Sequence, residues 1–192
     1  MARIGIFGGT FDPFTPGHAA VSTKAFEQLN LDKLIIVPTT VNYYRSDKRY
    51  LFTYDEKLKI IRDFMTGFKY PTEIDTIEQD KDGSWRTIDL VQYFRQKFPK
   101  DKLILIIGED SYNEFRTWTR WREILEYVEL AVANRCQKAN EWKPQEEVPA
   151  LPINMGDRFE DCSATVVRNK LIEEVMDLYL SDKDWYANLG GL

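Results

Sequence analysis

Short apolar runs alternate along this chain with segments whose apolar residues recur at helical spacing. An apolar run of about four to eight residues bounded by Gly or Pro is typical of a strand buried on both faces of a parallel sheet. Apolar residues three or four positions apart predict an amphipathic helix. These patterns predict strands at residues 3–8, 33–38, 102–108 and 127–133, and helices at residues 17–29, 53–65, 87–98 and 165–177.

Residues at the predicted element boundaries support this reading. Pro16 suits the first turn of a helix, where its missing N–H costs nothing. Thr53 and Glu56 have the spacing of a capping box. Ser163 stands at the start of the last predicted helix, which runs from Thr165 to about residue 177. Residues 136–150 lack periodicity and predict a surface loop.

The order of these elements predicts the fold. Residues 3–38 form one β-α-β unit, which implies parallel strands joined by a right-handed crossover. Because strands and helices go on alternating, we predict an α/β fold. It is a doubly wound, Rossmann-like parallel sheet with helices on both faces, in a single domain over 1–192. Ligands of such sheets bind beyond the carboxyl ends of the strands.

Composition restricts the class of protein. Of 192 residues, 43% are apolar and 14% aromatic, enough for a sizeable core. No apolar run reaches the roughly 18–20 residues that span a bilayer, and the first residues do not resemble a signal peptide. The net charge of −5 argues against a nucleic-acid partner, although a local phosphate site remains compatible with it. Cys136 and Cys162 lack zinc-site spacing, so we expect free thiols in a cytoplasmic protein.

The end of the first predicted strand carries the strongest chemical signal. Gly8 and Gly9 allow a ligand to approach the backbone closely, and the helix that follows offers free N–H groups and a positive dipole end. This combination binds phosphate, although it matches neither the dinucleotide fingerprint nor the P-loop. His18 is the only histidine in the chain. Taken alone, the segment is equally compatible with a plain turn and a solvent-facing His18.

Two separated motifs resemble one superfamily. Gly9-Thr10-Phe11-Asp12-Pro13 with Thr15-Pro16-Gly17-His18 is similar to the G-x-F-D-P…(H/T)-x-G-H signature of the nucleotidylyltransferases. Cys162-Ser163-Ala164-Thr165-Val166-Val167-Arg168 is similar to their second motif, I-S-S-T-x-x-R. Within that superfamily, three further segments resemble bacterial nicotinate-nucleotide adenylyltransferases. Residues 108–118 resemble their G-x-D…W block, residues 84–89 their S-Y-T-I-D segment, and residues 132–135 their strand ending in Arg.

The resemblance implies that AMP is transferred from ATP to nicotinate mononucleotide, giving deamido-NAD and pyrophosphate, with Mg²⁺ accompanying ATP. The attacking group is already a phosphate anion, so neither a general base nor a covalent intermediate is needed. Catalysis then rests on positioning and on stabilising charge at the phosphoryl oxygens. No carboxylate cluster in the sequence identifies metal ligands. The substrates are small molecules, and a homo-oligomer remains open.

The resemblance also implies residue roles. His18 would donate a hydrogen bond to the α-phosphate, Thr15 takes the place of another family histidine, and Arg168 would bind the leaving pyrophosphate. Arg168 alone would equally fit a solvated residue beside a helix N-cap. Residues assigned to ATP binding are Gly8, Gly9, Thr10, Phe11, Gly17, Asp110, Ser163 and Thr165. Of these, Asp110 would orient the ribose or assist the metal.

The acceptor side is assigned to Arg45, Thr87, Trp118 and Arg135. Trp118 is a platform on which the pyridine ring would stack, although its spacing from Phe115 also suits a core residue. Arg135 would bind the mononucleotide phosphate, or be an ordinary surface arginine.

This chain departs from the family pattern on the acceptor side. Asn42-Tyr43-Tyr44-Arg45 replaces the usual Pro-Pro-His-Lys, and Arg86 stands where the family has Tyr. Three alternatives therefore stay open: nicotinamide mononucleotide as acceptor, a phosphopantetheine adenylyltransferase, and a nucleotide-binding regulator without turnover.

Overall fold

The computed structural model describes residues 1–40, 50–81, 85–134, 142–155 and 169–171. The strands are β1 (Arg3–Gly9), β2 (Lys33–Pro38), β3 (Thr72–Ile74), β4 (Lys102–Gly108), β5 (Glu129–Asn134) and β6 (Ala150–Asn154). The helices are α1 (Pro16–Gln28), α2 (Tyr54–Met65), α3 (Thr87–Lys97), α4 (Glu109–Asn113) and α5 (Trp121–Tyr127), with 3₁₀ turns η2 (Ile77–Lys81) and η3 (Phe115–Thr117).

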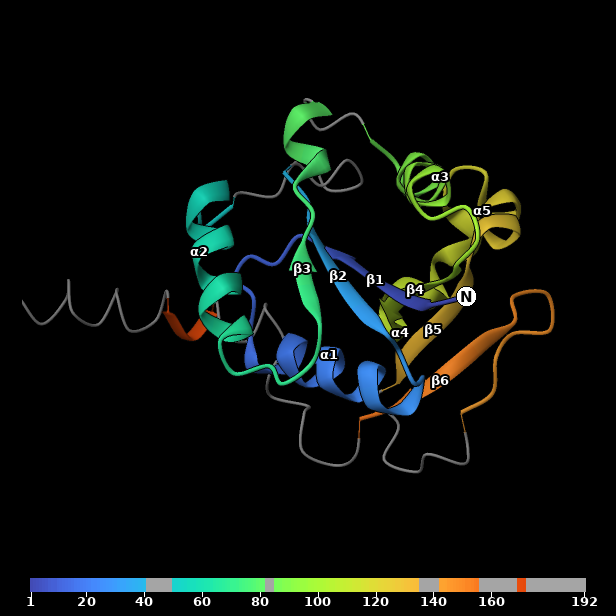
Figure 1. Ribbon diagram of the computed structural model, residues 1–192, viewed down its shortest axis with the longest axis horizontal. Coiled ribbons are helices and arrows are strands. Elements are labelled where there is room, and N and C mark those ends of the chain that lie inside the picture. Colours follow the sequence, from blue (N-terminus) through green and yellow to red (C-terminus); the bar gives the residue numbers. More distant parts are fainter. Residues whose placement is uncertain (41–49, 82–84, 135–141, 156–168, 172–192) are drawn as a thin grey trace, which may run out of the picture.

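The strands form one parallel sheet in the order β3-β2-β1-β4-β5-β6. The chain moves outward from β1 in one direction, then returns to β4 on its other side, which is the strand order of a doubly wound dinucleotide-type sheet. Figure 1 shows α1 and α2 on one face of the sheet and α3 and α5 on the other. The predicted α/β architecture is confirmed.

Each face of the sheet has its own apolar core. Alternate residues of a strand point to opposite faces, so Ile4 and Ile6 of β1 pack with α3 and α5, whereas Phe7 packs with α1. Gly5 lies between them, and a Cβ at that position would come within 2.5 Å of the Leu31 side chain. The glycine therefore lets the loop after α1 pack closely against the middle of the sheet.

The structure corrects several predicted boundaries. Strand β5 begins at Glu129 instead of residue 127, because the chain is still helical through Tyr127 in α5. Strands β3 and β6 were not predicted. The first has three residues and no apolar run, and the second contains Pro152, which is tolerated there because β6 is an edge strand.

Other segments agree with the sequence patterns. Strands β2 and β4 have the predicted bounds, and the Thr53–Glu56 capping box is present at the start of α2. Of the last predicted helix, residues 169–171 are described and helical. Of the predicted loop, residues 136–141 lie outside the described residues, and residues 142–149 belong to no helix or named strand, as predicted. In the part of the chain that the structure describes, no helix has the length and apolar character that crossing a membrane requires.

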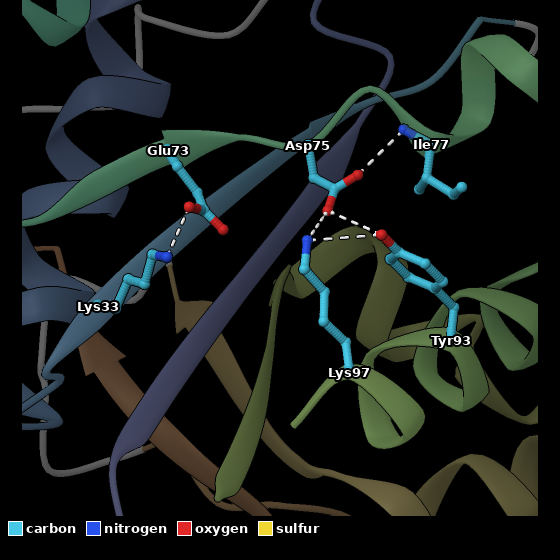
Figure 2. A network of polar contacts seen from close by, with 6 residues as sticks. All are labelled: Lys33, Glu73, Asp75, Ile77, Tyr93 and Lys97. Atoms are coloured by element: carbon cyan, nitrogen blue, oxygen red, sulfur yellow. Dashed lines mark hydrogen bonds and ion pairs between the residues drawn. The ribbon is translucent and has the colours of Figure 1, made fainter. Parts of the chain in front are cut away.

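Charged side chains fasten the β3 edge to both neighbouring elements (Figure 2). Lys33 of β2 forms an ion pair with Glu73 of β3 at 2.5 Å. Just beyond β3, Asp75 accepts hydrogen bonds from the Ile77 N–H (3.0 Å) and from Lys97 of α3 (2.7 Å). The Tyr93 hydroxyl, also on α3, donates to the same carboxylate at 3.3 Å. The Asp75 side chain is 9% exposed, and its hydrogen bond with Lys97 raises the pKa of the lysine.

Replacing Asp75 by Ala is expected to lower the free energy of unfolding by about 1–3 kcal/mol, because three donors lose a largely buried acceptor. Glu73→Ala is the matched control on the same edge: its ion pair with Lys33 is solvent-exposed, so the loss is expected to stay below about 1 kcal/mol. Urea unfolding of both variants measures the difference, and equal losses would contradict the assigned role of Asp75.

Candidate active site

Those residues assigned to ATP binding that the structure describes lie at or near the carboxyl edge of the sheet. Gly9, the last residue of β1, pairs with Pro38 at the end of β2. On the other side of β1, Gly108 at the end of β4 pairs with Ala133 of β5. In a doubly wound sheet the chain reverses its winding direction between β1 and β4, and ligands bind at that point. The site is therefore built on the ends of β1 and β4.

The turn after β1 is organised around Phe11. Its φ of 44° is in the left-handed region, and its buried ring packs edge-on against Phe7, Phe14 and His18 at centroid distances of 5.3, 5.1 and 5.1 Å. A Cβ at Gly9 would lie 2.9 Å from this ring. The glycine thus makes room for Phe11 as well as for a ligand, and only the backbone of Phe11 is placed to meet a nucleotide.

Thr15 and His18 form a reciprocal cap at the start of α1. The Thr15 N–H donates to His18 Nδ1 at 3.0 Å, and the Thr15 hydroxyl accepts from the His18 N–H at 3.4 Å. A nitrogen that accepts an N–H hydrogen bond carries no proton, so the neutral ring bears its proton on Nε2. Thr15 is only 1% exposed. Thr15 therefore caps the helix and orients His18.

Asp12 joins this turn to the segment before α2. The carboxylate is 1% exposed and accepts hydrogen bonds from the Leu51 N–H (3.0 Å) and the Phe52 N–H (2.9 Å). The motif drew attention to this position in the sequence, but gave no sign of its partners, which lie about forty residues away. Because the bonds satisfy two backbone donors, Asp12 holds the turn against the start of α2.

Sequence reasoning also missed two buried ionisable residues near the turn, Lys57 and Glu78. Lys57 of α2 is 1% exposed, and its ammonium donates to the carbonyl oxygens of Thr39 (2.9 Å) and Thr10 (3.3 Å). Burial raises the pKa of Glu78 to about 7, against a hydrogen bond from Thr39 and the nearby Lys57 charge, which lower it. The signal in the sequence was Lys57 itself, a charged residue one helical turn before Ile61 on the buried face of α2.

Asp110 lies in the first turn of α4, directly after β4, with its side chain exposed. It occupies the same sheet edge as Gly9 and is thus placed to face a bound nucleotide. Among the described residues, no group of three or more His, Cys, Asp or Glu side chains gathers as a metal centre would. Asp12 is buried and accepts hydrogen bonds from backbone amides, whereas Asp110 is exposed.

Two acceptor-side segments come together although they are far apart in the sequence. Arg86, directly before Thr87 at the start of α3, donates from Nη1 to the Thr119 hydroxyl at 3.0 Å. Trp118, the neighbour of Thr119, is half-buried, with its ring 5.2 Å from that of Phe115. The Trp118 side chain therefore packs partly against the core and remains partly accessible to solvent.

The remaining sequence-predicted residues lie outside the part of the chain that the structure describes. They are Arg45 and Arg135 on the acceptor side, and Ser163, Thr165 and Arg168 in the second motif.

Comparison with known proteins gives consistent results. The family model described as "Cytidylyltransferase-like" matches residues 6–170. A Methylibium petroleiphilum protein named "Probable nicotinate-nucleotide adenylyltransferase" is 32% identical, with 88% of this chain and 79% of that protein covered. A Chlorobium limicola protein of the same name is 31% identical, with 90% and 88% covered.

Solved structures share the fold. The Plasmodium falciparum nicotinic acid mononucleotide adenylyltransferase complexed with APC superposes with a TM-score of 0.69 at 15% identity, covering 88% of this chain and 83% of that one. The same enzyme complexed with NaAD gives a TM-score of 0.64 at 16% identity, covering 80% and 76%.

The raised pKa of Glu78 predicts how stability depends on pH. Its folded value of about 7 lies above the ordinary value of 4.5, so the unfolded chain releases this proton first as pH rises. The carboxyl therefore favours the folded state most at low pH, and this contribution is lost as pH rises from 4.5 to about 7. In Glu78→Gln that loss should disappear, so the variant gains stability relative to the wild type across the window.

Denaturant unfolding of both proteins between about pH 5 and about pH 8 measures this difference. Glu56→Gln is the control, because hydrogen bonds with Thr53 lower the pKa of Glu56 and place its titration below this range. A difference between wild type and Glu78→Gln that stays constant with pH would contradict the assignment.

Proposed function

Since this chain belongs to the cytidylyltransferase-like family, and within it to the nicotinate-nucleotide adenylyltransferases, we propose that it transfers AMP from ATP to nicotinate mononucleotide. A phosphate oxygen of the mononucleotide attacks the α-phosphorus of ATP, a new P–O bond forms, and the bond to the β-phosphate oxygen breaks. Deamido-NAD and pyrophosphate are the products, and the reaction serves NAD biosynthesis. We further propose that it takes place in the cytoplasm.

The orientation of His18 is the observation that carries this proposal. Its Nδ1 accepts from the Thr15 N–H, so Nε2–H is the donor of the neutral ring. In-line attack moves negative charge onto the oxygens of the α-phosphate, and a fixed donor stabilises this charge without reorganising. Three aromatic rings, Phe7, Phe11 and Phe14, surround the imidazole and limit its freedom to rotate. The arrangement requires no nucleophilic side chain, as expected for an anionic acceptor.

The phosphates of ATP meet the turn after β1 and the start of α1 in this scheme. Thr10 and Gly17 contribute backbone groups there, and the positive end of the α1 dipole favours an anion. From the sequence motif, Ser163, Thr165 and Arg168 complete the grip on the β- and γ-phosphates. A guanidinium is suited to this role because its donors match phosphate geometry.

Mg²⁺ accompanies ATP in this proposal and neutralises charge on the triphosphate when bound. It typically keeps several waters and is held by phosphate oxygens with one or two carboxylates. The exposed Asp110 at the end of β4 fits that pattern as a ligand, directly or through water.

The acceptor side favours the acid over the amide. Arg86 is held beside Trp118 by its bond to Thr119, so a positive charge lies next to the proposed stacking platform. A nicotinate carboxylate is attracted to that charge, whereas the amide of nicotinamide presents an N–H₂ to the same donors. Backbone N–H groups near Thr87 add to this selection.

Pyrophosphate release from ATP tests the proposed function. The purified protein is expected to release pyrophosphate with nicotinate mononucleotide and to form deamido-NAD in equal amount. Phosphopantetheine and nicotinamide mononucleotide serve as comparison acceptors. No release with any pyridine mononucleotide would refute the proposal and favour a nucleotide-binding regulator.

His18→Ala is expected to lower kcat by roughly 10²–10³-fold, because one transition-state donor is lost. Stability should fall by about 1–3 kcal/mol, because the Thr15 N–H loses its acceptor, and denaturant unfolding measures this effect separately. Lys24→Ala, at an exposed position of the same helix, controls for effects on α1. Steady-state kinetics provide the test. If His18→Ala retains more than about a third of the wild-type kcat, His18 is not a catalytic residue.

The ratio of kcat/KM for nicotinate over nicotinamide mononucleotide is expected to exceed about ten, since each mismatched donor costs about 1–3 kcal/mol. Arg86→Met should reduce this ratio, mainly by raising KM for the acid. Arg95→Met is the control: its guanidinium also lies on α3 but binds the Phe98, Asp101 and Tyr127 carbonyls. Side-by-side kinetics at saturating ATP measure both ratios, and a wild-type ratio near one would move the assignment to the amide.

A further inference from the structure

Lys57 is buried beneath the turn after β1 and is not part of any motif that the sequence presents. Removing an ammonium group from water costs several kcal/mol unless it gains strong partners. The protein supplies them from several segments: the Thr10 and Thr39 carbonyls, the ring of Tyr50 at 4.9 Å, and the ring of Tyr54 at 5.7 Å. This charge is therefore satisfied, but only by ordering the segments that provide its partners.

The two carbonyl partners lie at the ends of two neighbouring strands. Thr10 directly follows β1 and Thr39 directly follows β2, and the two are also joined by a bond from the Thr39 N–H to the Gly9 carbonyl at 2.9 Å. The Tyr54 hydroxyl adds a bond to the Pro38 carbonyl at 3.4 Å. Helix α2 thus reaches the carboxyl edge of the sheet with more than one group, and the Lys57 ammonium contacts both strand ends.

The bonds to Lys57 also determine the direction of the next N–H groups. In a planar trans peptide, the C=O and the following N–H point in opposite directions. Because the Thr10 carbonyl points at Lys57, the Phe11 N–H points away from it, and the Thr40 N–H is turned away for the same reason. Phe11 is the residue whose ring packs against His18.

Stability alone does not require a charge at this position. Replacement of a buried ion pair by apolar side chains of similar size is often neutral or stabilising. An ammonium differs from a methyl or thioether group in one respect that matters here, which is that it orients carbonyl groups. Glu78 lies near Lys57 on η2, and its backbone carbonyl accepts from the Thr40 hydroxyl at 3.4 Å.

We propose that Lys57 is a positioning residue for adenylyl transfer: by binding the Thr10 and Thr39 carbonyls, its ammonium aims the backbone N–H groups of Phe11 and Thr40 at substrate phosphates. The inference rests on the proposed function. It gives helix α2 a role in catalysis although none of its side chains needs to touch a substrate.

The test compares Lys57→Met with Lys57→Arg and with Lys59→Met. Methionine keeps the length and apolar character of the lysine stem and removes the charge, arginine restores a charge that can bind two carbonyls, and Lys59 is exposed on the same helix. With all proteins folded by circular dichroism, kcat/KM for ATP should fall on the order of 10–100-fold in Lys57→Met. It should recover to within about fivefold in Lys57→Arg and stay unchanged in Lys59→Met.

The kinetic constants of the folded variants, set against their melting temperatures, separate a positioning role from a purely structural one. A loss confined to melting temperature, with wild-type kcat and KM in folded Lys57→Met, overturns the proposal, and so does an equal loss in the Met and Arg variants. Should Lys57→Met fail to fold, the double variant Lys57→Met/Glu78→Gln removes the lysine charge together with the nearby carboxyl group, and wild-type kinetics in it overturn the proposal equally. An inactive wild type would instead refute the proposed function.

Discussion

All strands of the sheet run parallel, and this constrains everything else that the molecule does. Parallel pairing leaves the carboxyl ends of β1, β2, β4 and β5 along one edge, and the peptide groups that directly follow β1 and β2 have left the ladder. The N–H groups of such peptides can bind an anion such as phosphate. They are also a liability, because buried peptide groups without partners cost free energy.

The protein satisfies some of these peptide groups with buried charged side chains, in addition to backbone pairing. Asp12 takes the N–H groups of Leu51 and Phe52, and Lys57 takes carbonyl groups after β1 and β2. A carboxylate and an ammonium are complementary in this use, because one satisfies donors and the other acceptors. Asp75 applies the same chemistry at the β3 edge, where it joins strand to helix and lies outside the site. The carboxyl edge that forms the candidate active site is thus ordered by buried side chains.

The sequence predicted best where one physical effect dominates. Strands β2 and β4 were found to the residue because burial on both faces demands a continuous apolar run. Strand β3 escaped because its pattern, Thr72-Glu73-Ile74, carries no such run. His18 and the turn before it were found by motif, whereas the partners of Lys57 and the Arg86–Thr119 bond depend on which distant segments meet. Neither hydropathy nor spacing records such meetings, so these contacts required the tertiary structure.

One histidine, set among three phenylalanine rings, gives this protein a built-in spectroscopic probe. With a single imidazole in the chain, every histidine ring signal in a magnetic resonance spectrum belongs to the candidate active site, and no assignment by mutation is needed. The rings of Phe7, Phe11 and Phe14 lie 5.1 to 6.2 Å from it, close enough for their circulating electrons to displace its signals from solution positions. A nucleotide that binds beside this ring therefore shifts the imidazole signals, to which no other histidine contributes.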